Sequence, residues 1–277
     1  MFHKYAIIFQ SVVLLITNIH GSNIIEKDFT SLFRGFDGTV VIYDQTRDTY
    51  IVHNQKRANT RFTPFSTFKI PNSLIALETG VITDIDKQYQ WDSARYPAEQ
   101  WWPEQWKQKN SLRSAIKHSV VPFYRSIASE VNHEKMIAFI KRFEYGNMDI
   151  SSGIDNFWLD GSIAISAMEQ VQFLKKFYHN NFSLSESTIK SVKTVLIQEE
   201  TAKFRLSAKT GGGSLKNDPQ KALGWYVGYI EKGKSLYFFA INIDGKSIAD
   251  IKDSRIEIAR SVFSEMNVIE QEKIKEK

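Results

Sequence analysis

The pattern of apolar and polar positions along the chain predicts strands towards both ends and helices between them. Five segments combine β-branched and aromatic residues with polar boundaries, as the strands of a sheet do: residues 36–44, 49–54, 202–209, 223–231 and 235–243. A polar turn, Gln45–Asp48, joins the first two segments as a hairpin, and a second turn centred on Gly233 joins the last two.

Helical spacing of apolar residues predicts seven helices, several of which begin or end at residues with capping chemistry. They cover residues 66–79, 111–118, 122–130, 132–143, 166–178, 185–197 and 253–266. Gly80 is suited to close the first helix, Asn132 to cap the fourth, and Ser166 forms a capping box with Glu169. Residues 83–110 are rich in tryptophan without a sustained period, so we expect irregular structure with short helices there.

These elements favour an α+β fold. Strands at both ends and helices in the middle pack most economically as one antiparallel sheet built from both termini and flanked by helices, with a helical lobe of about residues 81–198 inserted. Residues 23–268 then form a single domain, and residues 269–277 form a charged tail. Because a sheet and an inserted lobe meet along a boundary, we expect a cleft between them.

Composition and charge exclude some classes of function. The 277 residues are 42% hydrophobic and 24% charged, as in ordinary globular proteins. The formal net charge of +5 is spread along the chain without a dense basic block, so nucleic acid is not an expected partner. The chain has no cysteine, which excludes disulfides and thiolate metal sites, and we expect no metal centre.

The first 22 residues have the layout of a secretory signal peptide. Lys4 precedes an apolar run from Tyr5 to Ile19, and Gly21 and Ser22 supply small residues for cleavage. The run is interrupted by Gln10 and is short for a membrane span, so a retained anchor is the less favoured alternative. We therefore expect export and no stable membrane anchor after cleavage.

The first candidate for chemistry is Ser66-x-x-Lys69. In a helical turn these two side chains lie on one face, and Ser66 stands near the positive end of the helix dipole. A serine becomes nucleophilic when an adjacent base takes its proton, and Lys69 is the nearest base. An N-cap serine followed by a solvated lysine would give the same spacing, but Phe68 and Ile70 make the setting of Lys69 apolar. Pro71 indicates an irregular or 3₁₀ opening turn.

A second candidate follows the strand predicted over residues 202–209. Lys209-Thr210-Gly211-Gly212-Gly213 is compatible with an ordinary glycine-rich turn. It is also compatible with a strand edge at which a ligand uses backbone N–H groups, while Lys209 and Thr210 bind an anion. The spacing excludes a phosphate loop.

Taken together and in this order, the motifs resemble those of the class D serine β-lactamases, the oxacillinases, which share a fold with penicillin-binding proteins. The matching pieces span most of the chain: Ser66-Thr67-Phe68-Lys69, Ser119-Val120-Val121, Tyr145-Gly146-Asn147, Trp158-Leu159, Lys209-Thr210-Gly211, Gly224-Trp225-Tyr226-Val227-Gly228 and Arg255, which the pattern places at the opening of the last helix.

The resemblance implies hydrolysis of small-molecule β-lactam antibiotics through an acyl-enzyme on Ser66. It also implies that CO₂ or bicarbonate converts Lys69 into an N-carboxylated lysine that acts as general base, with no other cofactor. Burial would lower the pKa of Lys69 and allow this reaction, and the Trp158 indole would donate to the new carboxylate. Val121 and Leu159 would enclose it.

The remaining roles implied by the resemblance concern the substrate. Ser119 would relay a proton to the lactam nitrogen, and the backbone N–H groups of Ser66 and Gly212 would form an oxyanion hole. A substrate carboxylate would be bound by a set of residues around the second motif: Lys209, Thr210, Gly211 and Arg255. Relatives usually carry a bulky aromatic where this chain has Gly212, so we expect an apolar wall to be missing.

Two alternatives use the same nucleophile. A β-lactam sensor domain stops at the acyl-enzyme, and a D-Ala-D-Ala peptidase acts on cell-wall peptides. Steady-state turnover of a β-lactam separates the hydrolase from both. The expected location is the bacterial periplasm, and the sequence leaves monomer and homodimer open.

Overall fold

A computed structural model of the chain describes residues 16–19, 22–159, 161–215 and 218–269. In this part of the chain eight strands form one sheet in the order β1-β2-β4-β3-β8-β7-β6-β5. They are β1 (Ile16–Ile19), β2 (Ser22–Glu26), β3 (Gly38–Asp44), β4 (Thr49–His53), β5 (Ile197–Glu200), β6 (Arg205–Leu215), β7 (Asp218–Lys232) and β8 (Ser235–Gly245).

The sheet confirms the prediction that both ends of the chain contribute to it. Strand β3 pairs with its hairpin partner β4 on one side and with β8 on the other, and β8 continues into β7 and β6. All these pairs are antiparallel, whereas β2 lies parallel to β4. The β7–β8 hairpin closes between Lys232 and Ser235, where Gly233 adopts a φ of +58°.

Eleven helical segments surround the sheet in the described residues. They are η1 (Thr30–Phe33), α1 (Gln55–Ala58), η2 (Phe65–Phe68), α2 (Lys69–Glu78), η3 (Glu104–Lys107), α3 (Leu112–Lys117), α4 (Val121–Val131), α5 (His133–Phe143), α6 (Ala167–Tyr178), α7 (Glu186–Leu196) and α8 (Ile248–Glu265). The predicted caps are present: the Asn132 side chain accepts from Lys135 N, and Ser166 and Glu169 form a reciprocal capping box.

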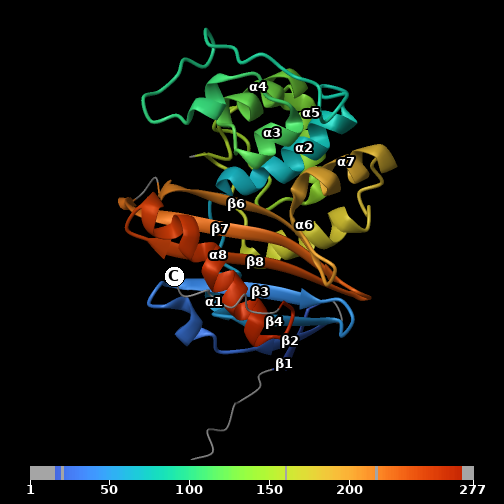
Figure 1. Cartoon of the computed structure of the whole chain (residues 1–277), viewed down its shortest axis with the longest axis vertical. Coiled ribbons are helices and arrows are strands. Elements are labelled where there is room, and N and C mark those ends of the chain that lie inside the picture. Colours follow the sequence, from blue (N-terminus) through green and yellow to red (C-terminus); the bar gives the residue numbers. More distant parts are fainter. Residues whose placement is uncertain (1–15, 20–21, 160, 216–217, 270–277) are drawn as a thin grey trace, which may run out of the picture.

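The helices lie on both faces of the sheet and above one of its edges (Figure 1). Helix α8 packs on β6, β7 and β8 from one side, and α6 packs on β3, β7 and β8 from the other. Helices α2, α3, α4, α5 and α7 gather beyond β6, where α2 packs against α4, α5 and α7. Strand β6 therefore forms the boundary between the sheet and this group of helices.

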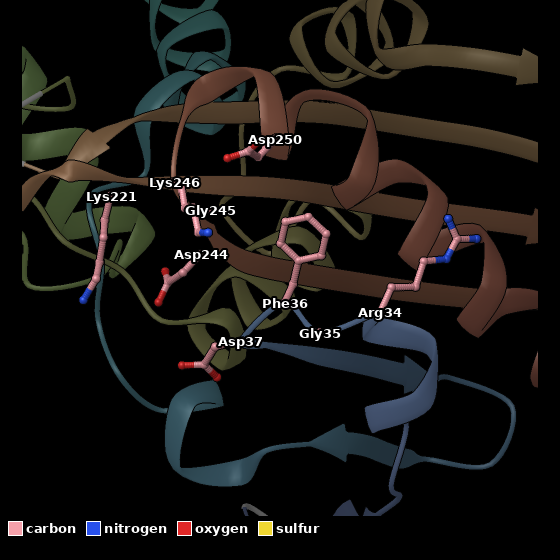
Figure 2. Close-up of a pocket in the computed structure, with 9 residues that line it drawn as sticks. All are labelled: Arg34, Gly35, Phe36, Asp37, Lys221, Asp244, Gly245, Lys246 and Asp250. Atoms are coloured by element: carbon pink, nitrogen blue, oxygen red, sulfur yellow. The ribbon is translucent and has the colours of Figure 1, made fainter.

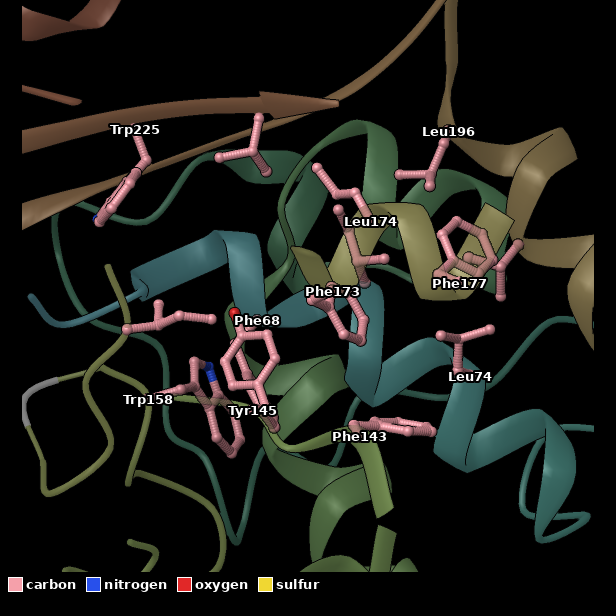
Figure 3. Close-up of a cluster of buried hydrophobic side chains, with 14 of the residues drawn as sticks. Phe68, Leu74, Phe143, Tyr145, Trp158, Phe173, Leu174, Phe177, Leu196 and Trp225 are labelled. Atoms are coloured by element: carbon pink, nitrogen blue, oxygen red, sulfur yellow. The ribbon is translucent and has the colours of Figure 1, made fainter. Parts of the chain in front are cut away.

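Two hydrophobic clusters hold these layers together. One lies between the sheet and the helices beyond β6, and includes Phe68, Leu74, Tyr145 and Trp158 (Figure 3). The other fills the space between the sheet and α8. Alternate residues of β6 face the two sides, as the pleat of a strand requires. Ala208 belongs to the α8 cluster, so Lys209 faces the helices.

Three sequence predictions about elements differ from the structure. Strand β6 continues through the glycines to Leu215 instead of ending before them. Helix α8 begins at Ile248, so Arg255 lies about two turns inside the helix, not at its opening. Strands β1, β2 and β5 were not predicted. Residues 1–15 and 20–21 of the predicted leader and residues 270–277 of the predicted tail lie outside the described residues.

A search of the described helices finds none with both the length and the apolar character needed to cross a membrane.

Candidate active site

Ser66 and Lys69 lie side by side at the junction of η2 and α2. Ser66 is in the 3₁₀ turn and Lys69 is the first residue of α2, which confirms the irregular opening turn expected from Pro71. The Lys69 Nζ lies 2.7 Å from the Ser66 Oγ. Since this is hydrogen-bond distance, the amine is placed to take the hydroxyl proton. Gly80, with a φ of +75°, follows the helix end as predicted.

Lys69 is buried, and its surroundings disfavour a positive charge. Its side chain is 0% exposed, and it forms no ion pair with any residue that the structure describes. Burial lowers the pKa of Lys69 well below its usual range, and the nearby Lys209 lowers it further. The uncharged amine is the form that can accept a proton or react with CO₂. The alternative of a solvated lysine is excluded.

The Trp158 indole packs against Phe68, the residue directly before Lys69, and has an unpartnered donor. Its ring stacks on Phe68, with centroids 5.4 Å apart and an interplanar angle of 21° (Figure 3). Trp158 is 0% exposed, and its Nε1–H has no hydrogen-bond partner among the described residues. An unpartnered buried donor costs about 1–3 kcal/mol, which an added acceptor would remove.

The loop that carries Trp158 is fixed by Tyr145-Gly146-Asn147. The Asn147 side chain donates to Ser162 O and accepts from Ala164 N, so it bridges the two ends of the loop. Gly146 has a φ of +58°, and a Cβ there would lie 2.1 Å from Ala164 O. These contacts give the motif a positioning role that its sequence alone did not show.

Ser119 approaches the site from the turn between α3 and α4. Its φ of +54° places it in the left-handed region, which is uncommon for a residue with a side chain. Lys209 Nζ donates to Ser119 Oγ at 3.2 Å and to Thr210 O at 2.8 Å. Val121, the first residue of α4, and Leu159 are partly buried against the same cluster as Trp158.

Two cations lie on opposite faces of β6. Burial and the nearby Arg255 lower the pKa of Lys209 to about 7. Burial lowers the pKa of Arg255 to about 10, against the opposing effect of Asp253. The Arg255 Nη1 donates to Gly211 O at 2.6 Å, whereas its Nε is buried without a partner in the described part of the chain. Arg255 therefore has one guanidinium donor that is bonded to β6 and one that is buried without a partner.

The glycines of β6 allow these close approaches. A Cβ on Gly211 would lie 2.8 Å from Pro64 O, within the segment that precedes Ser66. A Cβ on Gly212 would point the other way and lie 2.7 Å from Arg255 Nη1. A side chain at position 212 would thus compete with Arg255 for space. Gly212 therefore does more than remove an apolar wall: it leaves room for the Arg255 guanidinium beside β6.

The edge of β6 beside Ser66 is free of a strand partner. Strand β5 pairs only with residues 205–207 of β6, among the residues described. Further along β6 the 3₁₀ turn η2 packs over the strand, with Thr67 against Gly211 and Phe65 against Gly213. The geometry therefore brings Ser66, Lys69, Ser119 and Lys209 together beside β6, from three separate parts of the chain.

Comparison with known proteins identifies the family. The model of the penicillin binding protein transpeptidase domain matches residues 38–266. Beta-lactamase OXA-48 from Klebsiella pneumoniae is 41% identical over 207 residues, which make up 75% of this chain and 75% of that protein. The crystal structure of FUS-1 (OXA-85), a class D β-lactamase from Fusobacterium nucleatum subsp. polymorphum, is 37% identical with a TM-score of 0.80, over 87% of this chain and 98% of that one. The chain belongs to the class D β-lactamases.

A receptor domain is also similar to this class D β-lactamase. The C-terminal domain of the Bacillus licheniformis BlaR penicillin-receptor is 33% identical with a TM-score of 0.83, over 91% of this chain and 100% of that one. The family fold thus includes both hydrolases and a receptor.

Sequence reasoning missed Tyr124 in this class D β-lactamase. The Lys69 Nζ lies 5.3 Å from the centre of its ring, and its hydroxyl is 2.9 Å from Ser73 Oγ. Tyr124 is 0% exposed and occupies an ordinary apolar position of α4. Its sequence context gave no signal beyond helical periodicity.

A hollow lies away from these residues. It has a volume of about 510 Å³ and is lined by residues around the start of α8 and the η1–β3 connection, including Arg34, Asp37, Asp244 and Asp250 (Figure 2). None of the predicted site residues lines it. Charges of both signs face it, and no convergent set of catalytic groups accompanies them.

Proposed function

We propose that this protein hydrolyses β-lactam antibiotics through a covalent acyl-enzyme on Ser66. The observation that carries the proposal is the 2.7 Å contact between the Ser66 hydroxyl and a fully buried lysine amine. In attack on the strained lactam carbonyl, Ser66 Oγ bonds to the carbonyl carbon and gives up its proton, and the ring C–N bond breaks. The proton must then reach the lactam nitrogen.

Lys69 is the residue best placed to receive the Ser66 proton, and we propose that it is N-carboxylated in the active enzyme. Its lowered pKa favours the neutral amine that reacts with CO₂. The unpartnered Trp158 Nε1–H supplies a donor for the added group. A carbamate there would supply a proton-accepting carboxylate for both acylation and deacylation. Val121 and Leu159 would limit the access of water.

Lys209 and Ser119 link the nucleophile to the leaving nitrogen. The 3.2 Å contact between them supports a path in which Ser119 passes a proton to the lactam nitrogen and is resupplied by Lys209. The backbone N–H groups of Ser66 and Gly212 are proposed to form the oxyanion hole, where one donor is worth about 3–4 kcal/mol in a comparable hydrolase.

The substrate carboxylate is proposed to lie beside Lys209, Thr210 and Arg255. An anion placed there would meet the Lys209 ammonium, and the Arg255 guanidinium, which lies near enough to Lys209 to lower its pKa, would add a second positive charge. The negative charge of the anion would also raise the pKa of Lys209 from about 7 and so favour the charged form. The enzyme is further proposed to act in the periplasm after removal of the leader.

The second candidate function is a β-lactam sensor, which is favoured by the similarity to the BlaR receptor domain. Both functions require acylation of Ser66, but only the hydrolase releases the product. Steady-state hydrolysis of a chromogenic cephalosporin, increasing with added bicarbonate, is the expected result. A single stoichiometric burst without further product, at saturating bicarbonate, would instead assign the sensor function.

A further inference from the structure

A bulky ring and a glycine face one another where the turn bearing Ser66 meets strand β6. Phe65, which directly precedes Ser66, is 6% exposed. A Cβ on Gly213 would lie 2.3 Å from its Cε1, 2.7 Å from its Cδ1 and 2.8 Å from its Cζ. Non-bonded carbon atoms do not approach this closely. The Phe65 ring therefore occupies the space that a side chain at position 213 would need.

The ring cannot easily move aside, because the turn around it is held on both flanks. Phe65 has a φ of +48°, in the left-handed region that residues with side chains seldom adopt. Thr67 donates to Pro64 O through both its backbone N, at 3.1 Å, and its Oγ1, at 2.8 Å. Gln170, from α6, in turn donates to Thr67 Oγ1 at 2.9 Å.

The same segment is fastened to the sheet just before Phe65. Trp225 Nε1 donates to Thr63 O at 3.0 Å, and Trp225 pairs in register with Gly211 of β6. Two glycines on one face of β6, Gly211 and Gly213, thus receive the backbone at Pro64 and the ring of Phe65. Ser66 lies between these fixed points, so a shift of the ring displaces the nucleophile.

We propose that Phe65 and Gly213 form a matched large–small pair that positions Ser66 for acylation. Phe65 acts as a positioning residue: its ring rests on β6 and sets the distance between Ser66 and the groups on that strand. The inference rests on the proposed function only as far as acylation, a step common to the hydrolase and the sensor.

The test is a double-mutant cycle on the intact protein with a fluorescent penicillin as probe. The variants are Gly213→Ser, Phe65→Ala and the pair combined, and the measured quantity is the second-order rate constant of Ser66 acylation per folded molecule. Gly213→Ser is expected to lower this constant about 100-fold, the scale of a 1 Å misplacement. The double variant is expected to acylate as fast as Phe65→Ala alone, because the clash is gone. Phe139→Ala, which truncates a partly buried ring on α5, is the matched control.

Two results would overturn the proposal: an unchanged rate constant in Gly213→Ser, or losses that multiply in the double variant. If Gly213→Ser fails to fold, the same double-mutant cycle is measured with the milder substitutions Gly213→Ala and Phe65→Leu. Near-ultraviolet circular dichroism gives the folded fraction of each variant. A contact with a purely structural role would change the unfolding midpoint but leave acylation per folded molecule intact. Failure of the proposed function would give a different result from failure of this inference, because the fluorescent penicillin would then not label the wild-type protein.

Discussion

Replacing Trp158 with phenylalanine removes the free indole donor while keeping an aromatic ring against Phe68. The stacked arrangement, with centroids 5.4 Å apart, packs this ring against the turn that carries the nucleophile. We expect Trp158→Phe to bind CO₂ more weakly at Lys69, because the carbamate loses a donor. Acylation of Ser66 is expected to be retained in part, since the amine itself still lies 2.7 Å from the hydroxyl.

The magnitude follows from the burial of the donor. Trp158 is 0% exposed, so water cannot replace the lost hydrogen bond. A hydrogen bond to a charged acceptor contributes about 1.5–3 kcal/mol. With a factor of ten for each 1.4 kcal/mol, roughly 10- to 150-fold more bicarbonate is needed to reach half-maximal turnover.

The assay is a bicarbonate titration of steady-state cephalosporin hydrolysis, after CO₂ has been removed at acid pH. Carbon-13 NMR with labelled bicarbonate measures the carbamate directly. Trp91→Phe is the matched control, because the Trp91 Nε1 donates at 2.8 Å to Tyr96 O, a contact within one loop. Identical bicarbonate dependence in Trp158→Phe and wild type would refute the role of the indole in holding the carboxylated lysine.

Three further predictions concern the cations and the fold. Because the pKa of Lys209 is about 7, its ammonium is lost as the pH rises through that value. The kcat/KM for a carboxylate-bearing penicillin should therefore fall above pH 7. A pH profile in which Lys209→Arg shows the same fall would contradict this. In Gly212→Tyr the new Cβ would lie 2.7 Å from Arg255 Nη1 and displace the guanidinium. KM should therefore rise about tenfold for carboxylate substrates but not for their esters. Equal effects on both substrates would exclude displacement of Arg255. Arg57→Met should lower the free energy of unfolding by about 1.5–3 kcal/mol, because the Arg57 side chain is 9% exposed and donates at 2.6 and 2.7 Å to Asp244, which is 27% exposed. Urea denaturation measures the loss, and a value below about 1 kcal/mol would indicate a surface pair.

Much of the fold could be predicted because its elements depend on local chemistry. The strands near both ends are runs of β-branched and aromatic residues, and the caps at Asn132 and Ser166 form within one turn. The glycines of β6 could not be assigned from local preference, since glycine disfavours strands. Their extended conformation follows from pairing with β7, in which Gly211 lies opposite Trp225 and Gly213 opposite Leu223. The start of α8 was missed although Ser247 caps it by accepting from Asp250 N.

In the candidate site, too, some features follow from local sequence and others only from packing between distant elements. Helical spacing alone places Ser66 and Lys69 together, because three residues span one turn. The approach of Lys209 to Ser119 depends on how the sheet meets the helices; the resemblance to a family placed both residues in one site but did not predict their contact. Tyr124 and the contact between Phe65 and Gly213 had no sequence signal, because they arise from packing between elements far apart in the chain.

The order of the strands has a consequence for how the protein matures. Strand β3 emerges early from the ribosome, yet its partner β8 is among the last strands to be synthesised, with Gly38 paired to Ile243. Such distant pairing makes folding slow, because a long loop must close before the contacts form. The nascent chain therefore carries its nucleophile before the strand edge that binds substrate exists. A chain truncated ahead of β8 leaves β3 without its neighbour and is expected to be degraded instead of conferring activity.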